Sequence, residues 1–289
     1  MTHPLYDVGR MCLFFIPSFF CPLTFFSDAP FGRFARSGNS IFILDGIKVW
    51  IVMELVAPTA LLYSLIYRPL SAGESSLPLS GPQLLVVALF LIHYFHRAII
   101  SPLRTPSRSK SHAGILLSGS SFNSFNGTLL GTYLSSDFAH AYLKDAFSRP
   151  LFWLGVAVWA LGFWYNIVHD EVLLDLRRHA QAKGKAKKGA LDAENKDYYA
   201  IPHGYLYRWI SYPNYLCEWI EWIGWAAAGA PLPDFSSFGS VLRTILPPWI
   251  MVWGAVVLML PRAYRGHVWY HEKFPEYPKD RKAVIPYLY

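Results

Sequence analysis

Long hydrophobic stretches alternate with short polar segments along most of the chain. A helix needs about 20 apolar residues to cross the hydrocarbon core of a bilayer. The fourth of the candidate stretches is the weakest, because it is rich in Ser, Asn and Gly, although small residues also let helices pack closely in membranes. The pattern predicts an all-α, polytopic membrane protein with seven transmembrane helices, at about 10–26, 46–67, 83–103, 115–134, 151–176, 214–230 and 243–261.

The distribution of basic residues supports this topology. With seven spans, the segments that share one side of the membrane contain 19 Lys and Arg, and the opposite segments contain 5. Because Lys and Arg are enriched in cytoplasmic loops, we expect a lumenal N-terminus and a cytoplasmic C-terminus. The longest polar segment, 177–196, is expected to be a mobile cytoplasmic loop that can contact anionic headgroups.

The composition agrees with a single integral membrane domain over residues 1–289. Hydrophobic residues make up 53% of the chain, and only 16% of its residues are charged, against about 25% in soluble domains. The net charge is +7, but the basic residues lie between apolar segments and not on one amphipathic face, which argues against a nucleic-acid partner. The three cysteines have no CxxC spacing, and His93 and His96 have no third ligand at useful spacing, so no metal site is expected.

A carboxyl group, a phenol and a guanidinium occur within the second and third predicted spans. Glu54 lies in the middle of the second span, and Tyr94 and Arg97 share a face of the third. One interpretation is a structural ion pair between Glu54 and Arg97, since an unpaired buried charge is costly. The other is a protonated carboxyl in an apolar pocket, which could donate a hydrogen bond to a substrate carbonyl with Tyr94 beside it as an acid or oxyanion stabiliser.

Further polar groups are concentrated at the predicted cytoplasmic ends of the later spans. Asn166 and Asp170 lie four residues apart on one helix face and could hold ribose hydroxyls or an amide, although simple solvation of the helix end explains the spacing equally well. Asn214, Glu218 and Glu221 also share a face. Arg262, Arg265, His267 and Tyr270 flank the last span, where arginine side chains suit phosphate groups. No GxGxxG motif follows a strand, so a nucleotide would have to be held between helices.

Several motifs occur in the same order as in one known family. They are Met53-Glu54, His93-Tyr-Phe-His-Arg97, Asn166-Ile-x-x-Asp170, Tyr199-x-Ile-Pro-x-Gly204, Asn214-x-x-x-Glu218-x-x-Glu221-Trp222, Arg262-Ala through His267-x-x-Tyr270, Phe274-Pro-Glu-Tyr-Pro-Lys279 and Ile285-Pro-Tyr-Leu-Tyr289. This ordered set resembles the steroid 5-alpha-reductase family. The resemblance covers about residues 28–289, with a C-terminal core at about 145–289.

The resemblance implies an NADPH-dependent reductase of the endoplasmic reticulum membrane. The expected reaction reduces the carbon–carbon double bond of a 3-oxo-4-ene steroid, or of a similar sterol or terpenoid enone, with hydride added to the beta carbon. Glu54 and Tyr94 would hold and polarise the ketone. The residues expected to line the cofactor pocket are Arg97, Arg108, Asn166, Asp170, Tyr199, Asn214, Glu218, Arg262 and Tyr270.

Four positions depart from the family pattern. Gly266 replaces the first His of a terminal His-His pair, and Phe31 replaces a Tyr. Met53 replaces a Gln beside Glu54, the carboxyl expected to hold the substrate, and Ser101 stands where a Tyr is common. Because most polar groups of the cofactor pocket are kept, activity is expected. Met53 leaves the identity of the substrate open.

Other functions are also compatible with the sequence. A trans-2-enoyl-CoA or polyprenal reductase would share the C-terminal half, although Glu54 with His93-Tyr94-Phe95 favours the steroid branch. A membrane methyltransferase that uses S-adenosylmethionine would have a similar helical layout, but the Asn166, Asp170, Arg262 and Tyr270 set favours NADPH. A non-catalytic sterol-binding protein is the remaining alternative.

Overall fold

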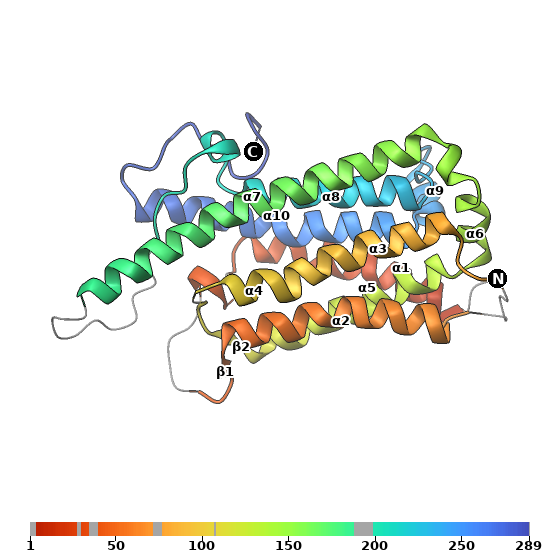
Figure 1. The fold of residues 1–289 in the computed structure, drawn as a ribbon, viewed down its shortest axis with the longest axis horizontal. Coiled ribbons are helices and arrows are strands. Elements are labelled where there is room, and N and C mark those ends of the chain that lie inside the picture. The colour runs from red at the N-terminus through yellow and green to blue at the C-terminus, as the bar shows by residue number, and fades with distance from the viewer. Residues whose placement is uncertain are drawn as a thin grey trace.

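The computed structural model describes residues 4–27, 30–34, 40–71, 77–106, 108–187 and 199–288. Figure 1 shows the long helices side by side in one bundle, with α6 and α9 at one end and the far end of α7 reaching beyond the other. The elements in these ranges are α1 (Pro4–Thr24), β1 (Ile43–Leu44), α2 (Gly46–Tyr67), α3 (Gly81–Phe95), a π-helical turn (His96–Ile100), α4 (Ser101–Arg104), β2 (Ser111–His112), α5 (Ala113–Leu134), α6 (Asp137–Leu143), α7 (Pro150–Lys187), α8 (Pro213–Gly229), α9 (Phe238–Thr244) and α10 (Pro247–Lys273). Short 3-10 turns lie at Gly32–Phe34, Ala146–Ser148 and Tyr205–Arg208.

The prediction of a mostly helical protein is confirmed in the described residues, where the only strands are β1 and β2, an antiparallel pair of two residues each. The bounds of α2 agree with the predicted stretch 46–67. The helix begins there because the Asp45 carboxylate accepts hydrogen bonds from the backbone N–H groups of Ile47 and Lys48. A capping box of Ser80 and Gln83 starts α3 in the same way.

The prediction that residues 177–187 belong to a loop was wrong. The apolar run stops near residue 176, but α7 continues to Lys187, so residues 177–187 are helical and do not form a loop. This extension is rich in Ala, Lys and Arg, which favour helix, and Arg178 forms an ion pair with Asp175 at 2.7 Å one turn earlier. The rest of the predicted loop, 188–196, lies outside the described residues.

The last predicted stretch, 243–261, is divided in the structure. Residues 243 and 244 end α9, and α10 begins at Pro247 after a sharp bend of 118°. Two consecutive prolines explain the break, because proline fits the first turn of a helix but restricts the residue before it to an extended conformation. Leu246 has that conformation.

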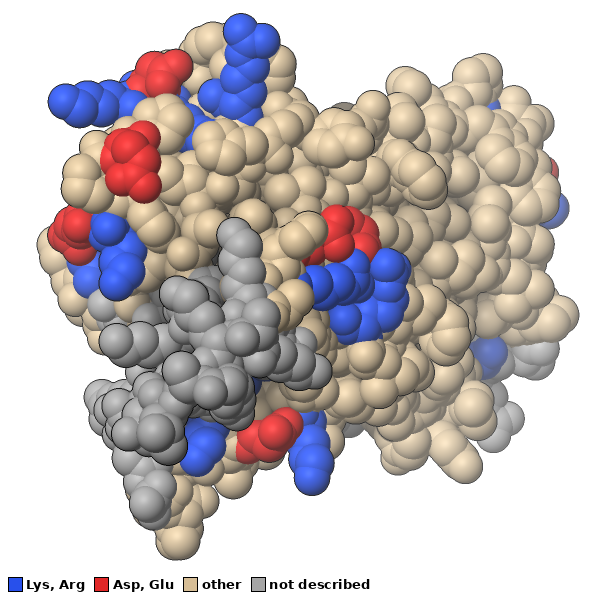
Figure 2. Space-filling view, turned by 60° about the vertical axis from the view of Figure 1, so that its left-hand side comes forward, with Lys and Arg blue, Asp and Glu red and all other residues tan. Residues whose placement is uncertain are grey.

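Three helical segments in the described chain are long and apolar enough to cross a membrane, at Gly46–Tyr67, Gly81–Arg104 and Pro150–Ala180. The bent pair α9 and α10 would be a fourth if it is one span. Figure 2 shows that charged side chains gather toward one end of the molecule, while much of the remaining face carries few of them. Both observations agree with a membrane protein.

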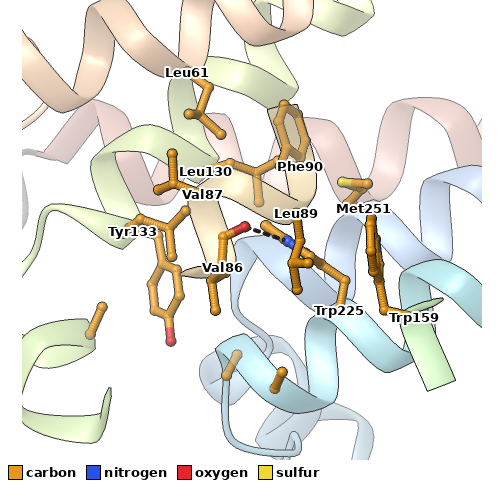
Figure 3. Packing of buried hydrophobic residues seen from close by; sticks show 14 of the residues in the cluster. Leu61, Val86, Val87, Leu89, Phe90, Leu130, Tyr133, Trp159, Trp225 and Met251 are labelled. Atoms are coloured by element: carbon orange, nitrogen blue, oxygen red, sulfur yellow. Dashed lines mark hydrogen bonds between the residues drawn. The ribbon is translucent and has the colours of Figure 1, made fainter. Parts of the chain in front are cut away.

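An aromatic and aliphatic core joins α3, α5 and α8 (Figure 3). Trp225 of α8 is fully buried, and its indole N–H donates to the Val86 carbonyl of α3 at 2.9 Å. Its ring lies 5.6 Å from that of Phe90. This core holds α3 and α8 together one to two turns away from the polar residues at His93–Arg97 and Glu218.

Glycines allow two pairs of helices to approach closely. A side chain at Gly162 of α7 would overlap the backbone of Glu221 in α8, and one at Gly131 of α5 would overlap the Leu61 carbonyl of α2. Small residues permit this approach in membrane helices. The weak hydrophobicity of residues 115–134 therefore has a structural cause, because their small residues face a neighbouring backbone.

We expect Gly162→Ala to lower the stability of the α7–α8 pair, because the added methyl group forces the helices apart. Overpacking of this kind costs about 1–3 kcal/mol. Gly239→Ala is the matched control, since a Cβ there meets no atom closer than 3.5 Å. The measurement is SDS-induced unfolding in mixed micelles, and equal stabilities for the two variants would contradict the close approach.

Candidate functional site

Arg97 connects two buried carboxylates from different helices. Its Nε donates to Oε1 of Glu54 in α2 at 3.1 Å, and its Nη1 donates to Oε2 of Glu218 in α8, also at 3.1 Å. Glu54 is only 5% exposed and Glu218 only 6%. The structural ion pair considered for Glu54 and Arg97 is therefore present, and it extends to a third residue that the sequence did not link to it.

The polar network continues from Glu218 to Asn166 and Asp170 in the middle of α7. The Asn166 amide donates to the Asn214 carbonyl at 3.0 Å and lies 3.5 Å from Glu218 Oε2. The Asn214 amide in turn donates to Oδ1 of Asp170 at 3.0 Å. The shared helix face predicted for Asn166 and Asp170 is confirmed, and Asn214 joins them across the α7–α8 interface.

Arg97 lies in the π-helical turn His96–Ile100, and this turn is also held from α2. The Trp50 indole N–H donates to the Arg97 carbonyl at 3.3 Å. The guanidinium of Arg108 stacks on the Trp50 ring at 3.8 Å from its centroid. A π-helical turn inside a helix is often found at a functional site.

Tyr94 lies at the apolar side of this network. Its ring packs against Phe90 at 4.6 Å and lies 6.3 Å from the ring of Trp222. The Tyr94 hydroxyl makes no hydrogen bond within the described part of the chain. The phenol is thus held by aromatic neighbours one turn from Arg97.

Arg108 and Arg262 bring positive charge to the same region. The pKa of Arg108 is lowered to about 9, chiefly by burial and then by the nearby charges of Arg177 and Arg97. Arg262 donates from Nε to the Tyr215 hydroxyl at 3.1 Å, while its Nη1 is buried without a hydrogen-bond partner in the described chain. Cations that lack a carboxylate partner fit an anionic group such as a phosphate.

Tyr199 and Tyr270 lie in an aromatic cluster near the end of α10. Tyr199 packs edge-on against Trp269 at 5.0 Å, and Tyr270 stacks on Tyr277 at 5.0 Å. Burial raises the pKa of Tyr277, whose hydroxyl exchanges a hydrogen bond of 2.7 Å with Ser211. Of the predicted residues, the structure connects Glu54, Arg97, Asn166, Asp170, Asn214 and Glu218 directly.

Comparison with known proteins gives a consistent result. A family model described as 3-oxo-5-alpha-steroid 4-dehydrogenase matches residues 109–289. The chain belongs to the steroid 5-alpha-reductase family. It is therefore an oxidoreductase of that family, as the ordered motifs predicted.

Individual relatives match nearly the whole chain. The chain is 32% identical to 3-oxo-5-alpha-steroid 4-dehydrogenase 1 of Bos taurus, over 90% of this chain and 88% of the relative. It is 34% identical to the steroid 5-alpha-reductase DET2 of Arabidopsis thaliana, over 91% and 89%. An uncharacterised protein of Schizosaccharomyces pombe is 34% identical over 98% of both chains.

The structure gives physical reasons for three departures from the family pattern. A side chain at Gly266 would overlap the Tyr212 hydroxyl, so Tyr212 fills the space that a histidine would need. The Arg262 guanidinium lies 3.6 Å from the centroid of Phe31, so this ring stacks on the cation without a hydroxyl. Met53 packs against α5, where a side chain at Gly119 would overlap its sulfur atom. Nothing in the structure explains Ser101.

Sequence reasoning missed a second buried pair beside the Arg97 network. His93 Nδ1 lies 2.6 Å from Oε1 of Glu221, which is fully buried. Oε2 of Glu221 has no hydrogen-bond partner in the described residues. The three-residue spacing of Glu218 and Glu221 signalled a common face, but only the packing of α3 against α8 shows that each carboxylate has its own partner.

We expect Arg97→Met to destabilise the protein, because it leaves Glu54 and Glu218 buried without a cation. Breaking a buried pair in this way costs about 3–5 kcal/mol. Arg104→Met is the matched control, since Arg104 pairs with Glu171 at 2.9 Å at an exposed site, where such pairs contribute about 1 kcal/mol or less. SDS titration in mixed micelles measures both losses, and a similar loss for the two variants would show that Arg97 is not a buried bridge.

Proposed function

We propose that this protein is an NADPH-dependent reductase of a steroid or similar lipid enone. The observation that carries the proposal is the continuous polar network from Glu54 to Asp170 through Arg97 and Glu218. One end of this network lies beside Tyr94 and its apolar neighbours, which suits a lipid ketone. Arg108 lies over Trp50 beside this network and is close enough to Arg262 for their charges to interact, and two such cations suit a phosphorylated cofactor.

The cofactor pocket is proposed to contain Arg97, Arg108, Asn166, Asp170, Tyr199, Asn214, Glu218, Arg262 and Tyr270. The partnerless Nη1 of Arg262 and the lowered pKa of Arg108 support an anionic ligand at this position. The amides of Asn166 and Asn214 would hold neutral polar groups of the nucleotide. Bound NADPH would supply the hydride that adds to the beta carbon of the enone.

The chain's own residues would polarise the ketone. Tyr94 would donate a hydrogen bond from its hydroxyl to the ketone oxygen, and Glu54 would do so when protonated, so that negative charge on the forming enolate is stabilised. The aromatic walls formed by Phe90 and Trp222 would exclude water from this oxygen. A proton that comes ultimately from the solvent would then be added to the alpha carbon of the enolate, so that the product gains two hydrogens, one as the hydride and one as this proton.

We also propose that the seven predicted segments all cross the endoplasmic reticulum membrane. Helices α1, α5 and α8 would cross the membrane together with the segments already found long and apolar enough to do so. The C-terminus would then lie in the cytoplasm. The partly polar faces of α5 and α8 support this, because they pack against α2 and α7 and need not contact lipid.

The position of α5 decides the topology. If α5 crosses the membrane, Lys110 and Lys144 lie on opposite sides, so Lys110→Cys and Lys144→Cys should react differently with a membrane-impermeant maleimide in sealed microsomes. Both variants also carry Cys12→Ser and Cys21→Ser, because those two cysteines are not buried and could react with the maleimide themselves. Equal labelling of the two variants would place both on one side and exclude α5 as a span.

Reductase activity is tested by NADPH consumption in membranes with progesterone and testosterone, with products analysed by mass spectrometry. We expect a gain of two hydrogens. Glu54→Gln and Tyr94→Phe should each lower turnover by about 10²- to 10⁴-fold, the contribution of a positioned acid, because neither removes a proposed cofactor contact. In Tyr94→Phe, NADPH affinity, measured by quenching of tryptophan fluorescence, should change by less than about threefold, or under 1 kcal/mol.

The cofactor assignment is tested in the same assays. Arg262→Ala should weaken NADPH binding by about tenfold or more, since a charge-assisted hydrogen bond contributes about 1.5–3 kcal/mol. Arg243→Ala, at an exposed position in α9, is the control and should leave binding unchanged. Binding without steroid turnover would direct the search to enoyl-CoA, polyprenal and terpenoid substrates, while absence of both would refute the proposal.

A further inference from the structure

The ion pair at Glu54 conflicts with the role proposed for this residue. Glu54 accepts a hydrogen bond from the Arg97 guanidinium, forms an ion pair with it and is almost fully buried. A carboxylate can only accept hydrogen bonds and cannot donate one to a ketone oxygen. Glu54 must therefore gain a proton before it can polarise the ketone.

Arg97 is shared between this carboxylate and the proposed cofactor pocket. One guanidinium carries a single positive charge, yet it contacts both Glu54 and Glu218 at 3.1 Å. Glu218 is the member of the pair that adjoins Asn166 and, through Asn214, Asp170. The ionised state of Glu54 thus depends on a cation that the pocket also uses.

No other cation contacts Glu54 in the described chain. Lys48, on the same helix, is exposed two turns away, and Arg104 of α4 pairs outward with Glu171. Helix α5 presents no charged group, and its Asn123 donates to the Met53 carbonyl.

The titratable groups of the helices packed against the site are also accounted for. From α3, Tyr94 has no hydrogen bond in the described residues, and His93 is paired with Glu221 of α8. Arg108 lies over Trp50 and forms no ion pair within the described ranges. Arg108 is nevertheless close enough for its charge to interact with Glu54, so the charge balance at Glu54 depends on Arg97, which contacts it, and on Arg108 at longer range.

We propose that Arg97 couples the two halves of the site, so that Glu54 takes up one proton when an anionic dinucleotide binds beside it. The inference rests on the proposed function and deepens it. When a negatively charged dinucleotide lies near Arg97, this single cation can no longer compensate Glu54 as well as Glu218. Ionised Glu54 then costs more free energy, and protonation of Glu54 removes that cost. Cofactor occupancy then prepares the hydrogen-bond donor that the ketone requires.

The coupling has a measurable consequence, because linkage between two binding events is reciprocal. If binding takes up one proton, NADPH affinity falls as the pH rises, by up to about tenfold per pH unit across the window in which the proton is exchanged. In Glu54→Gln, this pH dependence is lost. The variant keeps an oxygen that can accept from Arg97, so its fold is expected to survive.

Calorimetry of NADPH binding to the purified full-length protein measures the proton directly. Titrations are made at about pH 8, where a phosphate group with a second pKa of about 6 is already ionised, in buffers with different ionisation enthalpies. We expect uptake of about one proton in the wild type and close to none in Glu54→Gln. Glu272→Gln, at an exposed carboxylate outside the network, is the matched control and should keep the uptake.

The outcomes separate this inference from the function on which it rests. Failure of NADPH to bind at all would count against the proposed function. Binding without proton uptake, or uptake that persists in Glu54→Gln and disappears in Glu218→Gln, would overturn the coupling while leaving the reductase intact.

Discussion

The bridge from Arg97 to Glu54 and Glu218 is the interaction on which the arrangement of the site depends. It joins α2, the π-helical turn after α3, and α8. A buried charge is tolerated only when it is paired and hydrogen-bonded, so each of these helices is fixed by the need to satisfy the other two. The bridge therefore defines the relative depth of α2 and α8 as well as the chemistry between them.

The bridge can form because the surrounding helices approach one another closely. Gly162 lets α7 contact the backbone of α8 at Glu221, which brings Asn166 within reach of both Asn214 and Glu218. On the other side, Trp225 and Phe90 hold α3 against α8. Apolar packing supplies the framework, and the small residues set its spacing. The polar residues can complete the network only because the apolar packing and the small residues are both present.

The sequence predicted the helices well where hydrophobicity and capping agreed, as at 46–67. It failed at residues 177–187, because polarity marks the expected edge of a membrane and not the end of a helix. The order of the motifs along the chain predicted the candidate site residues. It could not show that Glu54 and Glu218 share one cation, because this requires the angle between α2 and α8. The pair of His93 with Glu221 was missed for the same reason.

The contact between Tyr212 and Gly266 limits how this enzyme can diverge. Because the phenol occupies the space of a Cβ at position 266, a side chain can be introduced there only if the Tyr212 ring moves or is replaced. A smaller residue at 212 would leave the space that a histidine at 266 needs. Substitutions at the two positions are therefore coupled by sterics, so that this branch and relatives with the histidine pair are expected to differ at both.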